Sequence, residues 1–523
     1  MVKFNTGNEG LRATQNYMGE DAYILHPEER LLNLCATCLW GEPKYYGGSQ
    51  VYNDILELAN KVDAEYVLQL AWYLREELYL RTIPMVLTSV VAHRDDIRGI
   101  KTTLLKAYLP HIIQRADEIN EIIACYNEMY CKDKKEPIPN ALKKSLKNIF
   151  ESEKFDEYQY AKYDGENKVK FKDVIRIAHP SKPQKILKEI LTETLPTPYT
   201  WEVELSKRGN TAEVWHELID SRKVGYMALL RNLANMIKAG IDYEHAVKVA
   251  STIANQKNVM ESKQFPFRFL SAYEKISELD SDEKVLKYEK ENSGSIVKMF
   301  KSALNEAVEI SAKNNIPKFE GKTIIICDNS GSARGDFGGA SQISFKSVRS
   351  MADAGNMLGL LAWYGSENTI FGVFGDNLII LKPDRNKGVL ENFEAVDNAG
   401  KGAGASTEQG VFTMLGYMIK DKIWADRLIV CSDLQIGDGN NSEYGLGGRI
   451  HPSVPELVKE YRKTVNPKFW YHSISFNGYG TNVIEGQRNT LTQGWNDRIF
   501  QYLKLIEEDK STQLKTIKER WVA

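Results

Sequence analysis

Between residues 50 and 310 the apolar residues recur every third or fourth position, as in VYNDILELANKV, AEYVLQLAWYLREELYLR and AVKVASTIAN. This spacing predicts amphipathic helices. Most of the segments end in a short polar or proline-containing break, a rhythm typical of stacked antiparallel helix pairs of the HEAT type. No clean sequence repeat accompanies the rhythm, so an irregular helical domain remains the alternative to a solenoid.

Near residue 316 the pattern changes to short β-branched runs that alternate with helical segments. KTIIICDNSGS predicts a strand and a loop, and QISFKSVRSMADAGNMLGLLAWYG predicts the helix that follows. This alternation predicts a mostly parallel sheet covered on both faces, with its ligand site at the carboxyl ends of the strands. We therefore expect two domains, residues 1–315 and 316–523. Further strands are expected at 368–375, 377–383, 426–433 and 469–476, and further helices at about 408–419, 455–465 and 489–507.

Composition and charge place the chain among ordinary globular proteins. Its 523 residues are 42% hydrophobic and 26% charged, and 68 basic against 70 acidic side chains give a net charge of −2. A site for a polyanion must therefore be a local patch. The start, MVKFNTGNEG, lacks a basic region followed by an apolar stretch, and no apolar run approaches a membrane span of about 18 residues. With only six cysteines, we expect a soluble cytoplasmic protein.

Oxygen-bearing side chains gather at the predicted strand ends of the second domain. Asp328 ends the first strand, Ser330 and Ser332 follow at spacings of two and four, Thr407 closes the loop GKGAGAST, and Asp433 ends the strand RLIVCSD. A carboxylate and hydroxyls are the ligands preferred by a magnesium-sized cation. The alternative is that Asp328 only caps the next helix. The loop lacks the GxxxxGK[ST] order of a phosphate-binding loop.

This constellation resembles the metal-ion-dependent adhesion site of von Willebrand factor A domains, DxSxS followed by separate Thr and Asp residues. The resemblance implies that Asp328, Ser330 and Ser332 contact a divalent cation, Mg²⁺, and that Thr407 and Asp433 complete the shell directly or through water. In that family a coordination position is left for an acidic group of a partner. A metal-dependent protein-interaction scaffold and a magnesium-dependent nuclease are the functions that this site alone leaves open.

Although the net charge of the chain is near zero, its helical half contains a positively charged zone. Residues 141–190 contain 12 basic and 8 acidic side chains, interleaved with aromatic residues on which unpaired bases could stack at about 1–3 kcal/mol each. These aromatic residues are Tyr158, Tyr160, Tyr163 and Phe171. The alternative is a solvated helix surface above aromatic core residues.

Several long strings are similar to signature segments of the TROVE module of the Ro autoantigen family, and they occur in the family's order. They are NLCATCLWGEPKYYGG, LREELYLRTIPMVL, KYDGENKVKFKDVIRIAHPSKP, LPTPYTWEVELS, GYMALLRNLANM and SKQFPFRFLSAY. The resemblance implies an α-helical HEAT-like repeat ring closed by an α/β von Willebrand A domain with a mostly parallel sheet. It also implies a noncatalytic, monomeric RNA-binding protein that acts in RNA quality control or stress response.

The same resemblance implies Y-like noncoding RNA on an outer basic surface and single-stranded 3′ ends of misfolded RNA in the ring. An exoribonuclease such as polynucleotide phosphorylase is an implied partner. Lys162 and His179 match positions of the Y-RNA surface, and Arg176 shares their face if this stretch is helical. Lys170 lies in the same positive zone, whereas Glu166 stands where a basic residue is expected.

Two arginines in apolar helical segments are candidate contacts for the single strand. Arg231 lies in ALLRN and Arg268 in PFRF. A long arginine stem projecting from an apolar surface can reach a phosphate, although a structural ion pair is the equal alternative. Cys35 and Cys38 form a CxxC pair, but their helical, apolar surroundings favour core packing over a zinc site shared with Cys125 and Cys131.

Overall fold

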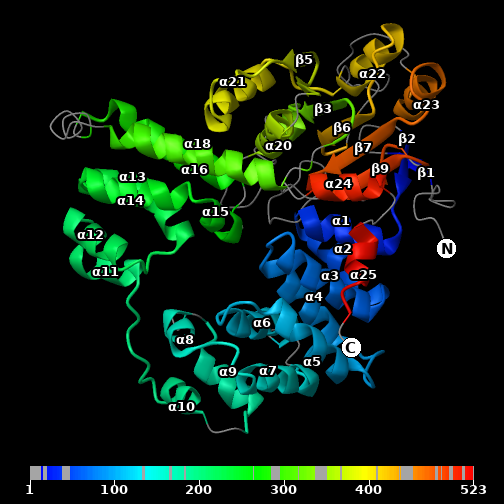
Figure 1. Cartoon of the computed structure of the whole chain (residues 1–523). Coiled ribbons are helices and arrows are strands. Elements are labelled where there is room, and N and C mark those ends of the chain that lie inside the picture. Colours follow the sequence, from blue (N-terminus) through cyan, green and yellow to red (C-terminus); the bar gives the residue numbers. More distant parts are fainter. Residues whose placement is uncertain are drawn as a thin grey trace. The chain divides into compact units, whose positions relative to one another are not determined.

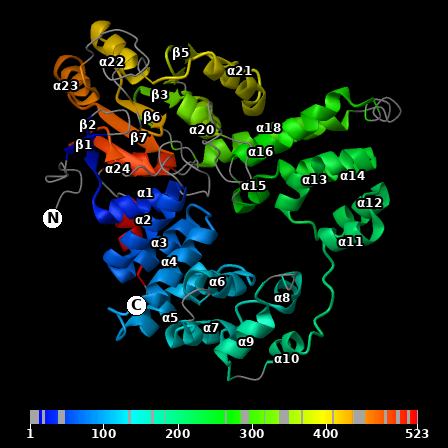
Figure 2. The ribbon, with the colours of Figure 1, turned by 180° about the vertical axis from the view of Figure 1, so that it is seen from behind.

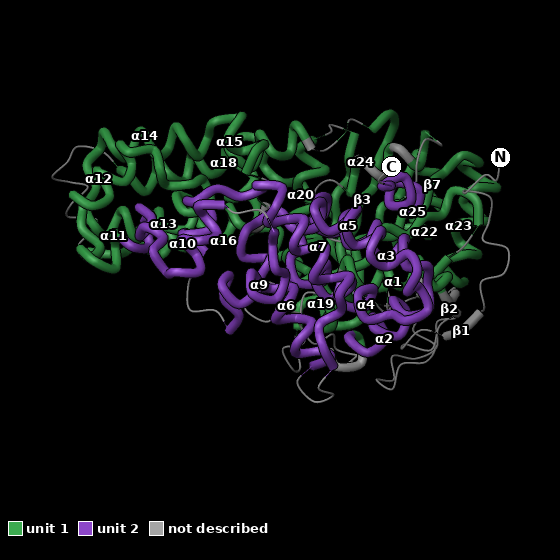
Figure 3. Tube along the Cα trace, turned by 90° about the horizontal axis from the view of Figure 1, so that it is seen from below, with its two compact units in different colours: residues 1–51, 204–513 green, residues 52–203, 514–523 purple. Residues whose placement is uncertain are grey.

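The computed structural model contains two compact units, residues 1–51 with 204–513 (unit 1) and residues 52–203 with 514–523 (unit 2), shown in Figure 3. Both predicted classes of structure, helical repeats and a mostly parallel α/β sheet, are confirmed. The structure describes residues 13–15, 21–37, 48–131, 136–163, 168–181, 184–262, 264, 266–283, 285, 295–315, 317, 319–335, 350–365, 368–407, 410–434, 436, 452–476, 481–484, 486–493, 499–508 and 513–521.

In its described residues unit 2 consists of helices that pack on other helices near them along the chain. The α3 helix packs on α4 and α5, and α7 packs on α5 and α9. The helices of this unit are α2 (Gly48–Lys61, from residue 52), α3 (Ala64–Glu76), α4 (Thr82–His93), α5 (Lys101–Ile112), α6 (Glu118–Tyr126), a π-helical turn (Asn127–Cys131), α7 (Asn140–Glu151), α8 (Glu157–Tyr163), α9 (Phe171–Ala178), α10 (Lys185–Leu191) and α25 (Gln513–Lys518).

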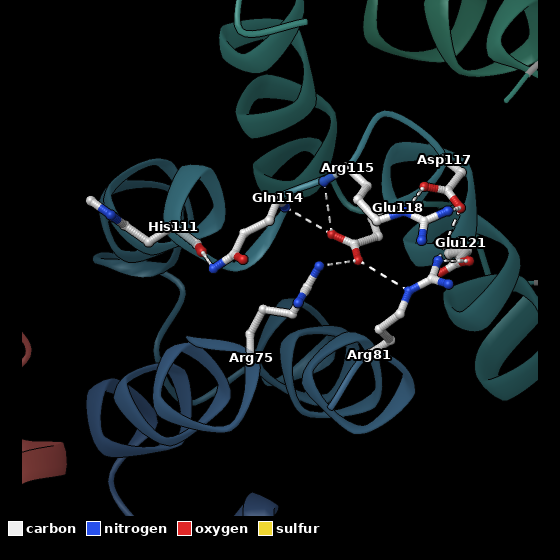
Figure 4. A network of polar contacts seen from close by, with 8 residues as sticks. All are labelled: Arg75, Arg81, His111, Gln114, Arg115, Asp117, Glu118 and Glu121. Carbon is white, nitrogen blue, oxygen red and sulfur yellow. Dashed lines mark hydrogen bonds and ion pairs between the residues drawn. The ribbon is translucent and has the colours of Figure 1, made fainter. Parts of the chain in front are cut away.

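A buried carboxylate, that of Glu118, joins α3, the start of α4 and the turn before α6 (Figure 4). It accepts hydrogen bonds from Arg75 Nη2 at 2.7 Å and Arg81 Nε at 3.3 Å, and from the backbone N–H groups of Gln114 and Arg115 at 2.8 and 3.1 Å. Arg75 and Arg81 both belong to the string LREELYLR. This part of the signature is therefore structural, because a fully buried carboxylate needs this many donors.

The C-terminal segment of unit 2 is held against α3 by one arginine. Arg520 forms ion pairs with Glu76 and with Glu77, the latter at 2.6 Å, and its guanidinium lies 5.2 Å from the ring centroid of Trp72. The backbone carbonyl of Lys518 also accepts a hydrogen bond from Gln69. The last helix therefore packs on a part of the chain more than 400 residues earlier.

The helical part of unit 1 is organised around its longest described helix, α18. This helix packs against α14, α15 and α16 on one side and against the helices of the sheet domain, α20 and α21, on the other. The α13 helix ends at Gly240, whose φ of 75° favours glycine. The helices are α1 (Pro27–Thr37), α11 (Trp201–Arg208), α12 (Ala212–Asp220), α13 (Tyr226–Ala239), α14 (Tyr243–Ile253), α15 (Gln256–Ser262), α16 (Pro266–Ser277), a 3₁₀ turn (Glu278–Ser281) and α18 (Ile296–Asn315).

The sheet domain carries six strands in the order β5-β4-β3-β6-β7-β9, and all neighbouring pairs are parallel except the β4–β5 hairpin (Figures 1 and 2). The mostly parallel arrangement agrees with the sequence prediction. The strands are β3 (Thr323–Asp328), β4 (Thr369–Phe374), β5 (Leu378–Leu381), β6 (Arg427–Ser432), β7 (Trp470–Ser475) and β9 (Asn489–Gln493), and the helices are α19 (Gly331–Arg334), α20 (Met351–Gly365), α21 (Val389–Lys401), α22 (Gly410–Lys420), α23 (Val454–Thr464) and α24 (Ile499–Glu507).

Side chains that alternate along the central strands pack under helices on both faces. Ile324 and Ile326 join the core formed with α22 and α23, whereas Cys327 points toward α20. The α20 helix lies close to the sheet at Gly359, where a Cβ would lie 2.8 Å from Cys327 Sγ and would also clash with the Phe371 ring. Glycine is therefore required at this helix–sheet contact.

The structure differs from the sequence prediction at three places in the sheet domain. The α21 helix over Val389–Lys401, between the predicted strand at 377–383 and the glycine-rich loop, was not predicted. The closing helix expected from about residue 489 begins at Ile499, and Asn489–Gln493 form β9 instead. A small antiparallel sheet of β1 (Ala13–Gln15), β2 (Asp21–Ile24) and β8 (Thr481–Asn482) was also missed, since strands of two to four residues carry little pattern.

Candidate RNA surfaces and candidate metal centre

The α9 helix presents three of the predicted RNA-binding residues to solvent. Phe171, Val174, Ile175 and Ala178 are buried, and Lys170, Arg176 and His179 are exposed. The helix begins where Asp173 accepts a hydrogen bond from the backbone N–H of Lys170 at 3.0 Å. It ends at His179, whose φ of 48° is in the left-handed region and turns the chain away.

Lys162 lies near the end of the preceding helix, α8, and is also exposed. Its ammonium is 5.6 Å from the ring centroid of Tyr163, and the guanidinium of Arg115 lies 4.5 Å from the same ring. The aromatic residues of this zone are divided. Tyr160 and Phe171 belong to the core, where their rings meet edge to face at 5.1 Å, whereas Tyr158 is 43% exposed.

An open groove follows the cationic side of α9 and α10. It has a volume of about 540 Å³, and its lining includes Ile175, Arg176, His179, Lys185, Lys188 and Leu191. The groove combines an apolar floor with four side chains that carry or can acquire positive charge, a lining that suits a ligand with flat apolar faces and an anionic backbone. Glu166, the acidic residue of the DGEN segment, lies outside the described residues.

Arg231 and Arg268 line one smaller pocket between α13 and α16, with a volume of about 230 Å³. Partial burial and then the charge of Arg231 lower the pKa of Arg268, so the two guanidinium groups repel each other. Lys275 lines the same pocket and pairs with Glu278 at 2.7 Å. The pocket is therefore a concentration of positive charge that an anion would stabilise.

All five candidate metal ligands lie at the carboxyl end of the parallel sheet. Asp328 ends β3, and its Oδ2 accepts a hydrogen bond of 2.6 Å from Ser432 Oγ, at the end of the neighbouring strand β6. Asp433 follows directly. The hydroxyl oxygens of Ser330 and Ser332 lie 3.0 Å apart in the loop after β3.

The loop that carries Thr407 is fixed beside the serine loop by backbone hydrogen bonds. Gly331 N donates to Ala405 O at 2.7 Å, two residues before Thr407. Asp376, after β4, accepts hydrogen bonds from the backbone N–H groups of Ala405 and Ser406, both at 3.0 Å. The sequence prediction that these separate segments meet at one edge agrees with this placement.

The donor set fits a hard divalent cation. Asp328 and Asp433 are 2% and 1% exposed, and Ser330, Ser332 and Thr407 are also buried. Burial raises the pKa of Asp328, although hydrogen bonds from Ser432 and Ser330 oppose the shift. Two carboxylates removed from water at one sheet edge are unfavourable without a compensating positive charge. The capping interpretation also has support, because Asp328 Oδ1 accepts the backbone N–H of Ser330 at 2.9 Å.

The described cysteines that were considered for a zinc site are buried or partly buried. Cys35 is buried and Cys125 and Cys131 are partly buried, and none of the three forms a disulfide within the described residues, which do not include Cys38. Sequence reasoning missed a cluster of His216, Asp242 and His245, which come from separate helices. Only the i, i+3 spacing of the last two gave a signal.

No helix in the described part of the chain has the length and apolar character of a membrane span.

Comparisons with known proteins find similarity over most of this architecture. The TROVE domain family matches residues 41–194 and 193–293. Telomerase protein component 1 of Mus musculus is 49% identical over 87 residues, and that of Rattus norvegicus is 48% identical over 87 residues; each match covers 17% of this chain and 3% of the relative. The crystal structure of the Deinococcus radiodurans Ro (RSR) protein aligns with a TM-score of 0.59 at 13% identity, covering 93% of this chain and 100% of that chain.

Proposed function

Because this chain belongs to the Ro family of TROVE-domain RNA-binding proteins, we propose that it is a noncatalytic carrier of noncoding RNA. Structured, Y-like RNA binds along α8, α9 and α10, and single-stranded 3′ ends of misfolded RNA bind at the pocket between α13 and α16. The protein acts in the cytoplasm as a monomer, in RNA quality control or stress response. An exoribonuclease of the polynucleotide phosphorylase type is the partner that would degrade the RNA it presents.

The observation that carries the proposal is the division of α9 into a buried apolar face and an exposed cationic face. Lys170, Arg176 and His179 lie on the exposed side, and Lys162 extends it from α8. Exposed cations along a helix bind phosphates without reading sequence. The apolar floor of the neighbouring groove adds surface on which an unpaired base can pack.

The second contact region serves the single strand. Arg231 and Arg268 face one pocket, and their mutual repulsion is relieved when a phosphate lies between them. Leu230, Leu233 and Met227 line the same pocket and can contact a base or ribose. The small volume suits one nucleotide of an extended strand better than a duplex.

The decisive experiment purifies the full chain and incubates it with labelled RNA and Mg²⁺. A stable complex without cleavage supports the carrier, and cleavage supports a magnesium-dependent nuclease. The absence of both a complex and cleavage supports a protein-interaction scaffold. Lys162→Ala with His179→Ala should weaken the binding of a structured RNA while the circular dichroism spectrum stays unchanged. Unchanged RNA retention by this double variant removes the proposed outer surface.

A matched control changes the same residue types elsewhere. Lys420 and His26 are also exposed and lie on α22 and just before α1, away from α8 and α9 in the sequence. Lys420→Ala with His26→Ala removes the same formal charge and should leave RNA affinity unchanged. An equal loss in both double variants would indicate a net-charge effect and not a site.

A second function is supported by the buried oxygen donors at the end of the sheet. We propose that Asp328, Ser330 and Ser332 hold Mg²⁺, with Thr407 and Asp433 completing the shell directly or through water. The cation would supply an open position for an acidic group of a protein partner. Asp328→Ala in a partner pull-down tests this interaction, which fails as metal-bridged if binding persists unchanged with a chelator present.

A further inference from the structure

Two histidines and two aspartates from neighbouring helices meet on the surface of unit 1, and none of them belongs to the proposed RNA surfaces or to the candidate metal ligands at the sheet edge. His216 lies on α12, whose last residue is Asp220, and His245 lies on the first turn of α14, which Asp242 caps. One ligand atom from each of His216, Asp242 and His245 lies within 4.8 Å of the other two. The α12 and α14 helices pack on each other, so these residues are brought together by the fold.

Two hydrogen-bond acceptor atoms of this cluster lie close together. His216 Nε2 accepts a hydrogen bond from the backbone N–H of Asp242 at 3.3 Å, and a metal bound to this nitrogen would replace that hydrogen bond. The same nitrogen lies 3.4 Å from Asp242 Oδ2, which is also an acceptor. Two acceptors at this distance repel each other unless a positive charge lies between them.

The spacing of these atoms fits a tetrahedral transition metal. Zinc–nitrogen and zinc–oxygen bonds of about 2.0–2.2 Å at a tetrahedral angle place their two ligand atoms roughly 3.4 Å apart. The distance from His216 Nε2 to Asp242 Oδ2 is 3.4 Å, and that from His245 Nε2 to Asp220 Oδ2 is 3.3 Å. Imidazole nitrogens combined with carboxylates are a ligand set typical of zinc and unlike the all-oxygen set at the sheet edge.

Asp242 also orients the second histidine. Its Oδ1 lies 2.8 Å from His245 Nδ1, and it accepts the backbone N–H of His245 at 2.9 Å. A hydrogen bond from Nδ1 to a carboxylate leaves Nε2 as the metal-binding nitrogen, the arrangement found around many metal-ligating histidines. The two imidazole rings stack with centroids 3.9 Å apart at 14°, so their in-plane lone pairs run nearly parallel, and one ring must turn about its side-chain bonds before both nitrogens can face one ion.

We propose that His216 Nε2, His245 Nε2 and a carboxylate oxygen of Asp242 bind a zinc-class divalent cation. Asp220, which lies 3.3 Å from His245 Nε2 but is not among the ligand atoms already within 4.8 Å of one another, turns toward the ion as the fourth ligand. The site is reachable from solvent, since the Asp242 and Asp220 side chains are about half exposed. Lys248 is the competitor, because its ammonium lies 2.9 Å from both Asp220 and Glu244. In the bound state Glu244 retains Lys248, and the ion ties the end of α12 to the start of α14.

The test titrates Zn²⁺ into the full-length, chelator-stripped, RNA-free protein in competition with a chromophoric chelator. Excess Mg²⁺ is present to occupy the oxygen site around Asp328. Wild type should bind one Zn²⁺ whose affinity falls by about 100-fold or more in His216→Ala with His245→Ala, since loss of even a supporting group typically lowers metal affinity 10–100-fold. Co²⁺ in place of Zn²⁺ should give the visible absorption of a tetrahedral nitrogen–oxygen site.

Two further variants keep the result interpretable. Asp242→Asn preserves the cap of α14, because asparagine caps as well as aspartate, and should still lose Zn²⁺ affinity. His26→Ala removes an exposed histidine outside the cluster and should bind as wild type does. Equal Zn²⁺ affinity in wild type and the double-histidine variant would overturn the proposal, and so would a Co²⁺ spectrum that the double variant leaves unchanged.

Discussion

Ser432 Oγ donates a 2.6 Å hydrogen bond to Asp328 Oδ2, so the ends of β6 and β3 are joined by side chains at the edge where the candidate cation site lies. Both residues are almost fully buried. The bond orients one oxygen of Asp328 and, through strand register, places Asp433 next to the loop of Ser330. We therefore expect substitutions of Asp328 and of Ser432 to have different effects on this site.

Asp328→Asn should abolish stabilisation by Mg²⁺, because it removes the negative charge that attracts the ion while preserving side-chain shape. Ser432→Ala should retain the Mg²⁺ response but lower the free energy of unfolding by about 1.5–3 kcal/mol, the range for hydrogen bonds to charged groups. Thermal melting with and without Mg²⁺ measures both effects. A Mg²⁺-induced shift in Asp328→Asn equal to that of wild type would contradict the assigned ligand.

RNA affinity should fall steeply with salt if α8 and α9 contact phosphates. Each phosphate neutralised contributes about 0.7–0.9 to the slope of log affinity against log salt. Lys162→Ala with Arg176→Ala should therefore lower the slope by roughly 1.4–1.8 if each residue neutralises one phosphate. Filter binding between low and physiological salt measures the slope, and a salt-insensitive complex in wild type would contradict electrostatic attachment.

The string LREELYLR illustrates how much of this molecule the sequence could predict. Helical periodicity correctly indicated the helices, and the residue types at strand ends indicated one oxygen-rich sheet edge. The buried role of Arg75 and Arg81 could not be derived, because their shared partner Glu118 lies about 40 residues away. The proximity of His216 and Asp242 could not be predicted for the same reason, since it depends on the packing of α12 on α14 and residues on separate helices carry no spacing signal.

Glu118→Gln should destabilise unit 2 more than the same substitution at an exposed glutamate does. Glutamine keeps one acceptor oxygen but leaves Arg75, whose side chain is 9% exposed, without its charged partner. Breaking a buried ion pair by removing one member typically costs about 3–5 kcal/mol. Urea unfolding followed by tryptophan fluorescence checks the effect. Glu121→Gln is the matched control, since Glu121 pairs with the same Arg81 at 2.7 Å but is 42% exposed and should cost less than about 1 kcal/mol.

A buried His472–Glu507–Arg427 cluster should make the sheet domain sensitive to acid. His472 Nε2 lies 2.8 Å from Glu507 Oε1, and Arg427 contacts both oxygens of Glu507 at 2.7 and 2.9 Å. Burial lowers the pKa of His472, so the folded state holds the neutral imidazole, with its proton toward Glu507 and its Nδ1 toward the hydroxyl of Thr490 at 2.7 Å. Burial opposes the charge of Glu507, but hydrogen bonds from His472 and Arg427 outweigh it and keep the pKa of Glu507 below its usual value.

Both depressed pKa values act in the same direction on stability. Each group contributes fully above its unfolded pKa, about 6.5 for histidine and 4.5 for glutamate, and the contribution is lost as pH falls toward the lower folded value. The free energy of unfolding should therefore decrease between pH 7 and 5 through His472 and further below 4.5 through Glu507. His472→Gln should flatten the first part of this profile, and Glu507→Gln should lower stability at pH 7 by about 3–5 kcal/mol because Arg427 loses its charged partner. Urea unfolding at stepwise pH measures both, and a profile in His472→Gln as steep as that of wild type between pH 7 and 5 would exclude His472 as the titrating group.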